Sequence, residues 1–386
     1  MGTSGILRRP AVPPPVRVRR SVHSLLRENP IHPIFLFYSR AIGEMKKGVA
    51  EIPPGSGRRV NIPGGLLDDP RSWRYQAAIH DYPLNDSTLS GRRRDLAAGI
   101  VDADPFAIDQ EPMPSAAEKA RFWRACRHGS WFFLPWHRMY LHFFEKIILS
   151  HVIKLKGPAD WALPYWNYSA PPGAAMGAEA LLPEPFRSPT IAGETNHLFV
   201  AERTGPTVPG GRSANDGGTF LVPSDVSLNS VRTGTTFRDV FGGPPVDNHP
   251  PGAGGTLEGT PHNQVHSKLG GATGFMGGFS TAPLDPIFWI HHCNIDRLWE
   301  VWVQRQKRRG SRDRNPNPSL PGLAPPVPQD AQDWLDASRV ISGPGFHFHD
   351  AEGKEVRMSV KEVLNTRLPP LSYEYEDTAD PFKGAA

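Results

Sequence analysis

Histidines with the spacing of metal ligands are the residues of this sequence best suited to carry chemistry. His262 and His266 lie four residues apart, which places both imidazoles on one face of a helix, where they can hold one metal ion. A third ligand has to come from elsewhere, and His292 in a later apolar stretch is the candidate. Such a pair is also common in structural roles, so the spacing alone does not establish a site, which needs a complete ligand set.

A second set of candidate ligands lies earlier in the chain and consists of His80, His128 and His137. Two sets of three neutral imidazoles without carboxylate ligands suit copper. Zinc accepts the same donors, whereas non-haem iron normally takes two histidines and a carboxylate. A lone histidine such as His80 is more often a structural residue, so the surrounding sequence has to decide.

Helices are expected to position these histidines. Apolar periodicity, capping residues and helix-starting prolines predict helices over the following segments: Pro33 to Val49, about Arg71 to Ile79, Ser115 to Arg127, residues 136–153, a segment opening at Thr260-Pro261, and Asp285-Pro286 to about Gln304. The stretch 170–259 is rich in Gly, Pro, Ser and Thr, which predicts a long irregular insertion with one short helix near Phe237. Short strands are expected between Phe346 and Tyr375.

This pattern favours a single, mainly α domain over residues 1–386, with long irregular loops and a few short strands. Within it, residues 1–28 are expected to form an extended N-terminal arm and residues 377–386 a short tail. No internal repeat is found in the sequence.

The sequence around the histidines resembles the type-3 copper family, which comprises tyrosinases, catechol oxidases (plant polyphenol oxidases) and hemocyanins. Two long stretches match the copper signatures of that family at almost every position, from His128 to Glu145 and from Asp285 to Asp296. Shorter matches lie in four further segments: 69–80, 162–167, 373–375 and 15–19. The resemblance covers nearly the whole chain and is weakest between Ala170 and Gly255.

The resemblance implies a four-helix bundle that holds two copper ions. Carried over residue by residue, the first copper takes His80, His128 and His137, and the second takes His262, His266 and His292. His292 is preferred to His291 because the family signature places the ligand four residues before Asp296. His291 is then expected to lie behind the ligands. Asp296 and Arg138 are expected either to orient ligands or to form a structural ion pair.

Cys126 precedes His128 by two residues. In fungal tyrosinases and some hemocyanins a cysteine at this position forms a thioether with the matching histidine, so the resemblance implies a Cys126–His128 crosslink. Two alternatives stay open, an ordinary buried thiol and a disulfide with Cys293. Cys293 itself is expected to be a small core residue.

Three further residues carry expected roles from the resemblance. Glu258 and Asn263 occupy the positions that hold a water proposed to deprotonate monophenols, with a loop carboxylate and a first-turn residue as the plain alternatives. Phe279 matches a bulky residue that restricts access to one copper in plant catechol oxidases. The other prominent histidines are expected to be structural: His142, His347 and His349.

Composition limits the class of protein. The chain has 386 residues, 38% of them hydrophobic and 21% charged, with a formal net charge of +4, which is typical of a folded globular protein. The excess basic residues lie at Arg8, Arg9, Arg17, Arg19 and Arg20 and between Arg305 and Arg314, and we interpret them as solvated surface rather than a nucleic-acid site. Two cysteines and no recognisable leader favour a cytoplasmic location over export without such a leader.

The resemblance therefore implies an oxidase that uses dioxygen and two copper ions to convert o-diphenols to o-quinones, and that also hydroxylates monophenols. Two rivals are an o-aminophenol oxidase and a non-catalytic oxygen carrier like hemocyanin. The chain ends soon after Tyr375, without room for a shielding domain, which favours the enzyme. The expected partner is a small phenol, with no nucleic acid and no membrane, and an oligomer is left open.

Overall fold

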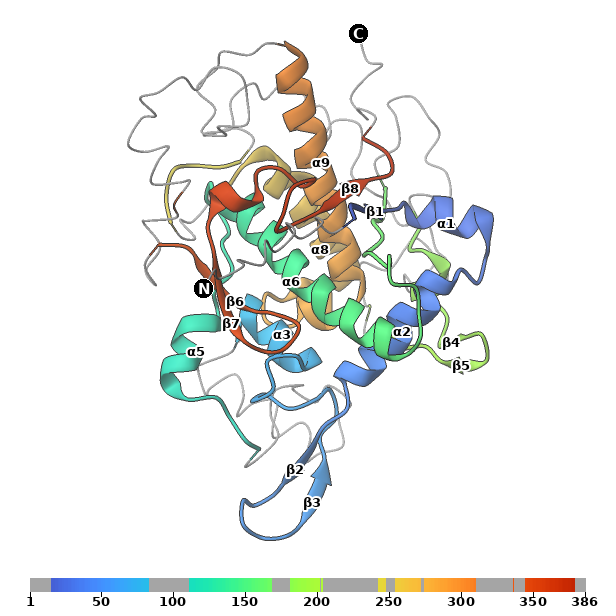
Figure 1. The fold of residues 1–386 in the computed structure, drawn as a ribbon, viewed down its shortest axis with the longest axis vertical. Helices are drawn as coiled ribbons and strands as arrows, with labels where there is room; N and C mark the ends of the chain where they lie inside the picture. The colour runs from blue at the N-terminus through green and yellow to red at the C-terminus, as the bar shows by residue number, and fades with distance from the viewer. Residues whose placement is uncertain are drawn as a thin grey trace, which may run out of the picture.

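A computed structural model describes residues 15–82, 111–168, 181–201, 203, 242–247, 254–271, 274–309, 336 and 344–378. This part of the chain is mainly helical, as the sequence predicts (Figure 1). Its α-helices are α1 (Val22–Glu28), α2 (Pro33–Met45), α3 (Trp73–His80), α5 (Ala116–Phe122), α6 (Phe133–Lys154), α8 (Gln264–Gly270) and α9 (Ile287–Arg309). None of the described helices is long and apolar enough to cross a membrane.

The two longest helices, α6 and α9, pack against each other at the centre of the fold, and α2 packs on α6 (Figure 1). Stacked aromatic side chains join them, with the ring centroids of Phe144 and Trp289 3.4 Å apart. Both rings are fully buried, and large buried aromatics contribute strongly to core stability. Because α6 carries His137 and α9 carries His292, this packing fixes two candidate ligands relative to each other.

Shorter helical turns complete the described part. They are a π-helical segment η4 (Glu258–Asn263) and the 3-10 turns η2 (Glu184–Phe186), η5 (Phe275–Gly277), η6 (Ala282–Leu284) and η7 (Val360–Val363). The segment η4 leads directly into α8, and η6 packs against α3. These turns bring the second group of histidines onto the helical core.

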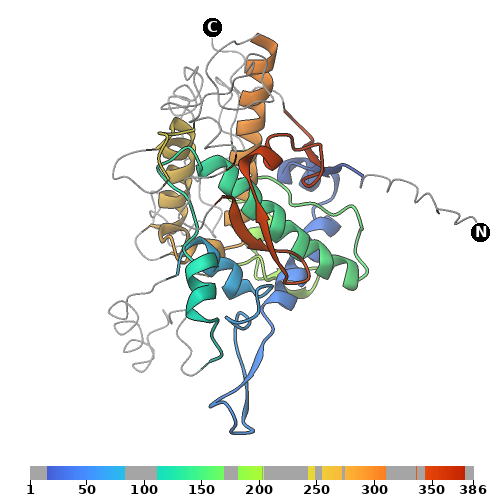
Figure 2. The same ribbon diagram turned by 60° about the vertical axis from the view of Figure 1, so that its left-hand side comes forward.

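Short strands pair in twos around the helices. The pairs are β1 (Arg17–Arg19) with β8 (Tyr373–Tyr375), β2 (Val49–Glu51) with β3 (Arg59–Asn61), β4 (Thr190–Ile191) with β5 (Glu194–Thr195), and β6 (Phe346–His349) with β7 (Glu355–Met358). Among the strand pairs of the described residues, β1–β8 alone is parallel, and it joins segments from opposite ends of the sequence. The β6–β7 hairpin lies across α6 and touches α5 (Figure 2).

The N-terminal segment differs from the extended arm that the sequence suggested. Val22 to Glu28 form a helix, because Val22 and Leu25 lie on the same helical face and are both fully buried. Residues 1–14 lie outside the described part, and so do Arg8 and Arg9.

The interpretation of the basic residues as solvated surface is wrong for Arg19. Its side chain is fully buried, and its Nε donates to Glu145 at 2.9 Å. Buried charges need such partners, so this arginine is part of the core architecture. The side chains of the second basic run, Arg305 to Arg314, lie outside the described part.

The predicted helices are present, with shifted ends. The first ends at Met45 rather than Val49, which pairs with Asn61 in β2–β3. The helix capped by Ser115 ends at Phe122 rather than Arg127, because the backbone of Trp123 is extended and that of Arg124 is left-handed (φ 57°), so neither residue continues the helix. The Ser115 cap itself is present, with Oγ accepting from the Glu118 amide at 3.2 Å.

Two helix starts also need correction. The helix expected to open at Thr260-Pro261 begins earlier, in a π-helical turn from Glu258, and Thr260 itself is extended. The helix expected from Asp285-Pro286 starts at Ile287, whose amide donates to Asp285 Oδ1 at 3.1 Å, and it runs to Arg309.

Much of the stretch 170–259 lies outside the described part, including the helix expected near Phe237. Its described portions hold η2 and the β4–β5 hairpin. The strands expected between Phe346 and Tyr375 are confirmed as β6, β7 and β8.

Candidate metal centre

Three predicted ligands of the first set lie together. His80 is the last residue of α3, His128 lies in the loop between α5 and α6, and His137 lies in the second turn of α6. With Cys126 they form a buried group whose potential ligand atoms all lie within 4.8 Å of one another. The fold therefore brings together histidines that lie as far as 57 residues apart in the sequence, His80 and His137.

The second set forms an equally compact group. His262 lies in η4, His266 in α8 and His292 in α9, and their nitrogen atoms lie within 4.8 Å of one another. His291, adjacent to His292, belongs to the same cluster by this distance.

The two groups face each other. The imidazole rings of His137 and His292 are stacked at 12° with centroids 4.5 Å apart, and those of His128 and His262 are 5.7 Å apart. The described residues thus form one paired centre rather than two separate sites.

Backbone carbonyl oxygens orient three of these rings. The Nδ1 atoms of His80, His137 and His266 lie 2.8, 2.8 and 2.9 Å from carbonyl oxygens of Phe279, Phe133 and Met276. A carbonyl can only accept a hydrogen bond, so each Nδ1 carries the hydrogen and each Nε2 holds a lone pair. This is the usual way in which a protein fixes the tautomer of a metal-binding histidine.

The electrostatic environment keeps these imidazoles neutral. Burial lowers the pKa of His266 to about 4, and it lowers the pKa of His262 and His292 well below the ordinary value. The buried Nε2 of His262 has no hydrogen-bond partner among the described residues. Uncharged, inward-facing donors that lack a partner are what a metal ion needs, and nitrogen donors without carboxylates fit copper.

His291 is held differently from the other histidines. Its Nδ1 lies 2.9 Å from the Tyr168 hydroxyl, and its ring is stacked on His262 with centroids 5.5 Å apart. This contact was not anticipated from the sequence, although Tyr168 directly follows the matched segment 162–167.

Cys126 lies against the ring of His128, with Sγ 2.9 Å from Nδ1. Burial raises the pKa of this thiol well above its ordinary value. Both cysteines are free and buried, so the structure contains no Cys126–Cys293 disulfide.

Glu258 lies four residues before His262 and is buried, with 4% of its surface exposed. Burial raises its pKa to about 8, although the Gly129 amide, which donates to its carboxylate at 2.8 Å, acts in the opposite direction. A carboxyl group that titrates in this range is suited to act as a base on a phenol. Asn263 is exposed and its Oδ1 lies 2.9 Å from Nδ1 of His262.

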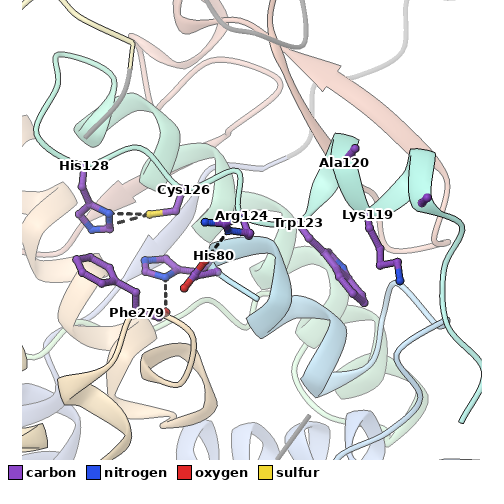
Figure 3. Close-up of a pocket in the computed structure, with 10 residues that line it drawn as sticks. His80, Lys119, Ala120, Trp123, Arg124, Cys126, His128 and Phe279 are labelled. Carbon is purple, nitrogen blue, oxygen red and sulfur yellow. Dashed lines mark hydrogen bonds and ion pairs between the residues drawn. The ribbon is translucent and has the colours of Figure 1, made fainter. Parts of the chain in front are cut away.

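Phe279 lies over the first group of histidines (Figure 3). Its ring centroid is 5.1 Å from that of His128 and 6.5 Å from that of His80. Phe279 is 59% exposed, so it forms the outer wall of the centre.

The remaining predicted residues lie outside the two groups. Arg138 and Asp296 form a buried ion pair at 2.5 Å, one residue from His137 and four from His292. His347 contacts Glu355 at 2.8 Å, and His349 packs on Phe122. His142 is fully buried, where desolvation lowers its pKa.

Comparison with known proteins decides the family. Residues 70–305 match the family model of the common central domain of tyrosinase, and residues 329–385 match the polyphenol oxidase middle domain. The chain belongs to the tyrosinase family. Members of the tyrosinase family use two copper ions and dioxygen, and the two histidine groups fit that pair of ions.

Individual relatives agree with this assignment. The tyrosinase HcTyr1 of Hahella sp. is 35% identical over 356 residues, which cover 88% of this chain and 60% of that protein. A chloroplastic polyphenol oxidase of Malus domestica is 31% identical over 327 residues, covering 82% and 44%. The structure of latent apple tyrosinase has the same fold, with a TM-score of 0.56 at 24% identity, covering 96% of this chain and 64% of that one.

This member of the tyrosinase family spans about half the length of the curated relatives that it matches. The position of its C-terminus therefore carries no conclusion about a shielding domain. The expectation of a cytoplasmic location is also wrong, because the relatives from Malus domestica and Vicia faba are named as chloroplastic proteins. A low cysteine count does not distinguish such compartments.

The orienting carbonyls were not predicted from the sequence. The carbonyl of Phe133 could have been found, because it lies one helical turn before His137. Those of Met276 and Phe279 come from turns whose course no local pattern specifies.

Proposed function

We propose that this chain is a dicopper oxidase that converts o-diphenols to o-quinones with dioxygen and also hydroxylates monophenols at the ortho position. The observation that supports the proposal best is the pair of facing histidine groups with a buried carboxyl group, Glu258, beside them. The relative from Hahella is named a tyrosinase and the one from apple a polyphenol oxidase, which is why both steps are included.

The proposed ligands are His80, His128 and His137 for one copper and His262, His266 and His292 for the other, held by helices that we propose to form a four-helix bundle. The copper ions supply the electron transfer to dioxygen when they are bound. The residues of the chain keep the imidazoles neutral, exclude bulk water from the buried centre and limit entry of the phenol.

Glu258 is proposed to remove the proton of a monophenol. A free phenol has a pKa of about 10, so little of it is ionised near neutral pH, and a nearby base raises that fraction. In the structure the Glu258 carboxylate accepts a hydrogen bond from the Gly129 amide, and Asn263 contacts His262. The proposal adds a water molecule that bridges Glu258 and Asn263.

Phe279 is proposed to guide the phenol. Its ring, with those of His80 and His128, forms an aromatic wall against which a planar substrate can stack. A bulky substituent directed at this wall is expected to slow binding.

Oxygen uptake by the copper-loaded protein tests the proposal, with tyrosine, methylcatechol and o-aminophenol in parallel. We expect rapid uptake with methylcatechol and slower uptake with tyrosine. Uptake with o-aminophenol alone would contradict the proposal in favour of an aminophenol oxidase, and reversible oxygen binding without any product would indicate a carrier.

The ligand assignment is tested with His262→Ala, which should lose bound copper and all oxidation. The matched control is His347→Gln, since His347 is a buried histidine outside both groups. Tyrosine hydroxylation that persists in His262→Ala would exclude this ligand set.

A further inference from the structure

A cavity of about 900 Å³ opens beside the first group of histidines (Figure 3). Its wall near the metal centre is formed by His80, His128 and Phe279, and its far wall by α5. The cavity therefore offers space beyond Phe279 for a molecule larger than a phenol ring.

Arg124 lies between the two walls of this cavity (Figure 3). Its backbone is in the left-handed region, φ 57°, and its amide donates to the Ala78 carbonyl of α3 at 3.2 Å. The next amide, of Ala125, donates to Ile79 at 3.0 Å. These bonds tie Arg124 to the end of α3, beside His80, and a strained residue held in this way at a site edge suggests a functional constraint.

The guanidinium group of Arg124 can reach a ligand. Its Nε donates to Asp81 at 3.2 Å, and the side chain is 55% exposed. This contact engages Nε, and the half-exposed side chain lines the cavity. A guanidinium presents parallel N–H groups that match the two oxygens of a carboxylate.

The charge around the cavity favours an anion. Asp81 is its acidic lining residue, whereas Lys119 and Arg124 are basic. A neighbouring cavity of about 650 Å³ shares Ala120, Trp123 and Arg124 with it. The second cavity adds three arginines, Arg121, Arg127 and Arg357, and one carboxylate, Glu355. Two of these arginines already pair with carboxylates, Arg121 with Glu355 at 2.7 Å and Arg127 with Asp247 at 3.1 Å.

We propose that the enzyme selects phenols that carry a carboxylate on a short side chain, and that Arg124, assisted by Lys119, binds this carboxylate. The inference rests on the proposed function and adds a substrate class to it. The ring lies against Phe279 with its hydroxyl toward the histidines, and the carboxylate extends along the cavity to Arg124. Arg124 is a specificity residue in this arrangement, because it contacts the substrate remote from the reacting atoms.

The test compares the catechol dihydrocaffeate with its neutral methyl ester on the copper-loaded protein. Arg124→Gln should raise KM for the acid about fivefold, as expected for a partly exposed charge contact, and leave kcat unchanged. The ester should be unaffected. The matched control is Arg40→Gln, which also removes an arginine paired with a carboxylate, Glu194, but lies outside both cavities, and it should leave the ratio of acid to ester unchanged.

Two further measurements keep the inference testable if Arg124→Gln does not fold. In the unmodified protein the preference for the acid should weaken with rising salt, because the contact is partly exposed. Lys119→Gln should reduce the same preference by a smaller factor. An unmodified protein that treats acid and ester alike, or a change that affects both substrates equally, overturns the inference.

Binding of phenylpropionate and of uncharged phenylpropanol, measured by calorimetry, separates this inference from the proposed function. If no phenol is oxidised, the proposed function fails, but tighter binding of phenylpropionate that depends on Arg124 still supports the carboxylate site. Equal binding of the two compounds, or inorganic phosphate bound as tightly as phenylpropionate, overturns it.

Discussion

At the scale of the residue, the proposed chemistry depends on backbone carbonyl groups and on burial, and neither can be read from the sequence. His80, His137 and His266 are each committed to one tautomer by a backbone carbonyl, which directs Nε2 toward the centre. The proposed role of Glu258 depends on its burial, because burial raises its pKa to about 8.

Glu258→Gln should reduce hydroxylation of tyrosine by about a hundredfold or more, the usual contribution of a general base, and change oxidation of methylcatechol much less. In the unmodified enzyme, hydroxylation should rise with pH as the carboxyl loses its proton. Two nearby copper ions favour the ionised form, so the midpoint should fall below about 8. The pH profile of tyrosine hydroxylation measures this, with the exposed carboxyl variant Glu184→Gln as control. An unchanged profile in Glu258→Gln would assign the base to another group.

Cys126 is expected to form a thioether with His128. The sulfur already lies 2.9 Å from Nδ1, and bond formation removes the thiol hydrogen and one ring hydrogen, with their two electrons passing to dioxygen. The copper-loaded protein should therefore be lighter by one hydrogen pair in an intact mass spectrum, and Cys126→Ala should lack this deficit. If the mass of the active protein shows no such deficit, Cys126 is an ordinary buried thiol.

At the scale of the element, a buried charge network holds the ligand-bearing helices in place. Asp296 of α9 pairs with Arg138 of α6 at 2.5 Å, and the Tyr375 hydroxyl of β8 donates to it at 2.6 Å. Arg19 of β1 lies 3.4 Å from the same carboxylate. The network therefore connects both ends of the described chain to the two helices that carry His137 and His292.

Asp296→Ala should lower the free energy of unfolding by about 3–5 kcal/mol, because it leaves two buried guanidinium groups without their shared partner. Burial alone would raise the pKa of Asp296, but Arg138, Arg19 and two tyrosine hydroxyls lower it overall. A lowered pKa means that this stabilisation is present above the ordinary value of 3.8 and is lost as the pH falls below it.

Urea unfolding of the copper-free protein at neutral and acidic pH measures both effects. The control is Glu194→Gln, which removes an exposed ion pair with Arg40 and should leave the unfolding free energy nearly unchanged. A similar stability of Asp296→Ala and the unmodified protein would mean that the network is not structural.

At the scale of the whole molecule, copper should stabilise the fold because its ligands come from separate segments. The proposed ligands lie in α3, the α5–α6 loop, α6, η4, α8 and α9, and an unfolded chain does not hold them together. Free copper at a hundredfold excess over Kd should add about 2.7 kcal/mol for each site.

Thermal unfolding with copper and with a chelator should therefore differ by several degrees. The difference should shrink in His262→Ala and persist in His347→Gln. Equal melting temperatures with copper and chelator would show that the ions do not bind to the folded protein.

The sequence by itself determined the candidate ligands, because the matched stretches around His128, His137 and His292 are long and local. It also predicted the mainly helical architecture, since helical periodicity and capping residues are local signals. The division into one domain stays a prediction, and the oligomeric state stays open.

Only the tertiary structure decided which groups meet. Arg19 reads as a surface charge in the sequence, yet β1–β8 pairing places it in the core beside Glu145. Phe279 and His80 are 199 residues apart and meet because turns, rather than a regular element, carry Phe279 back to α3. Long-range contacts of this kind depend on packing of the whole chain, which no local pattern specifies.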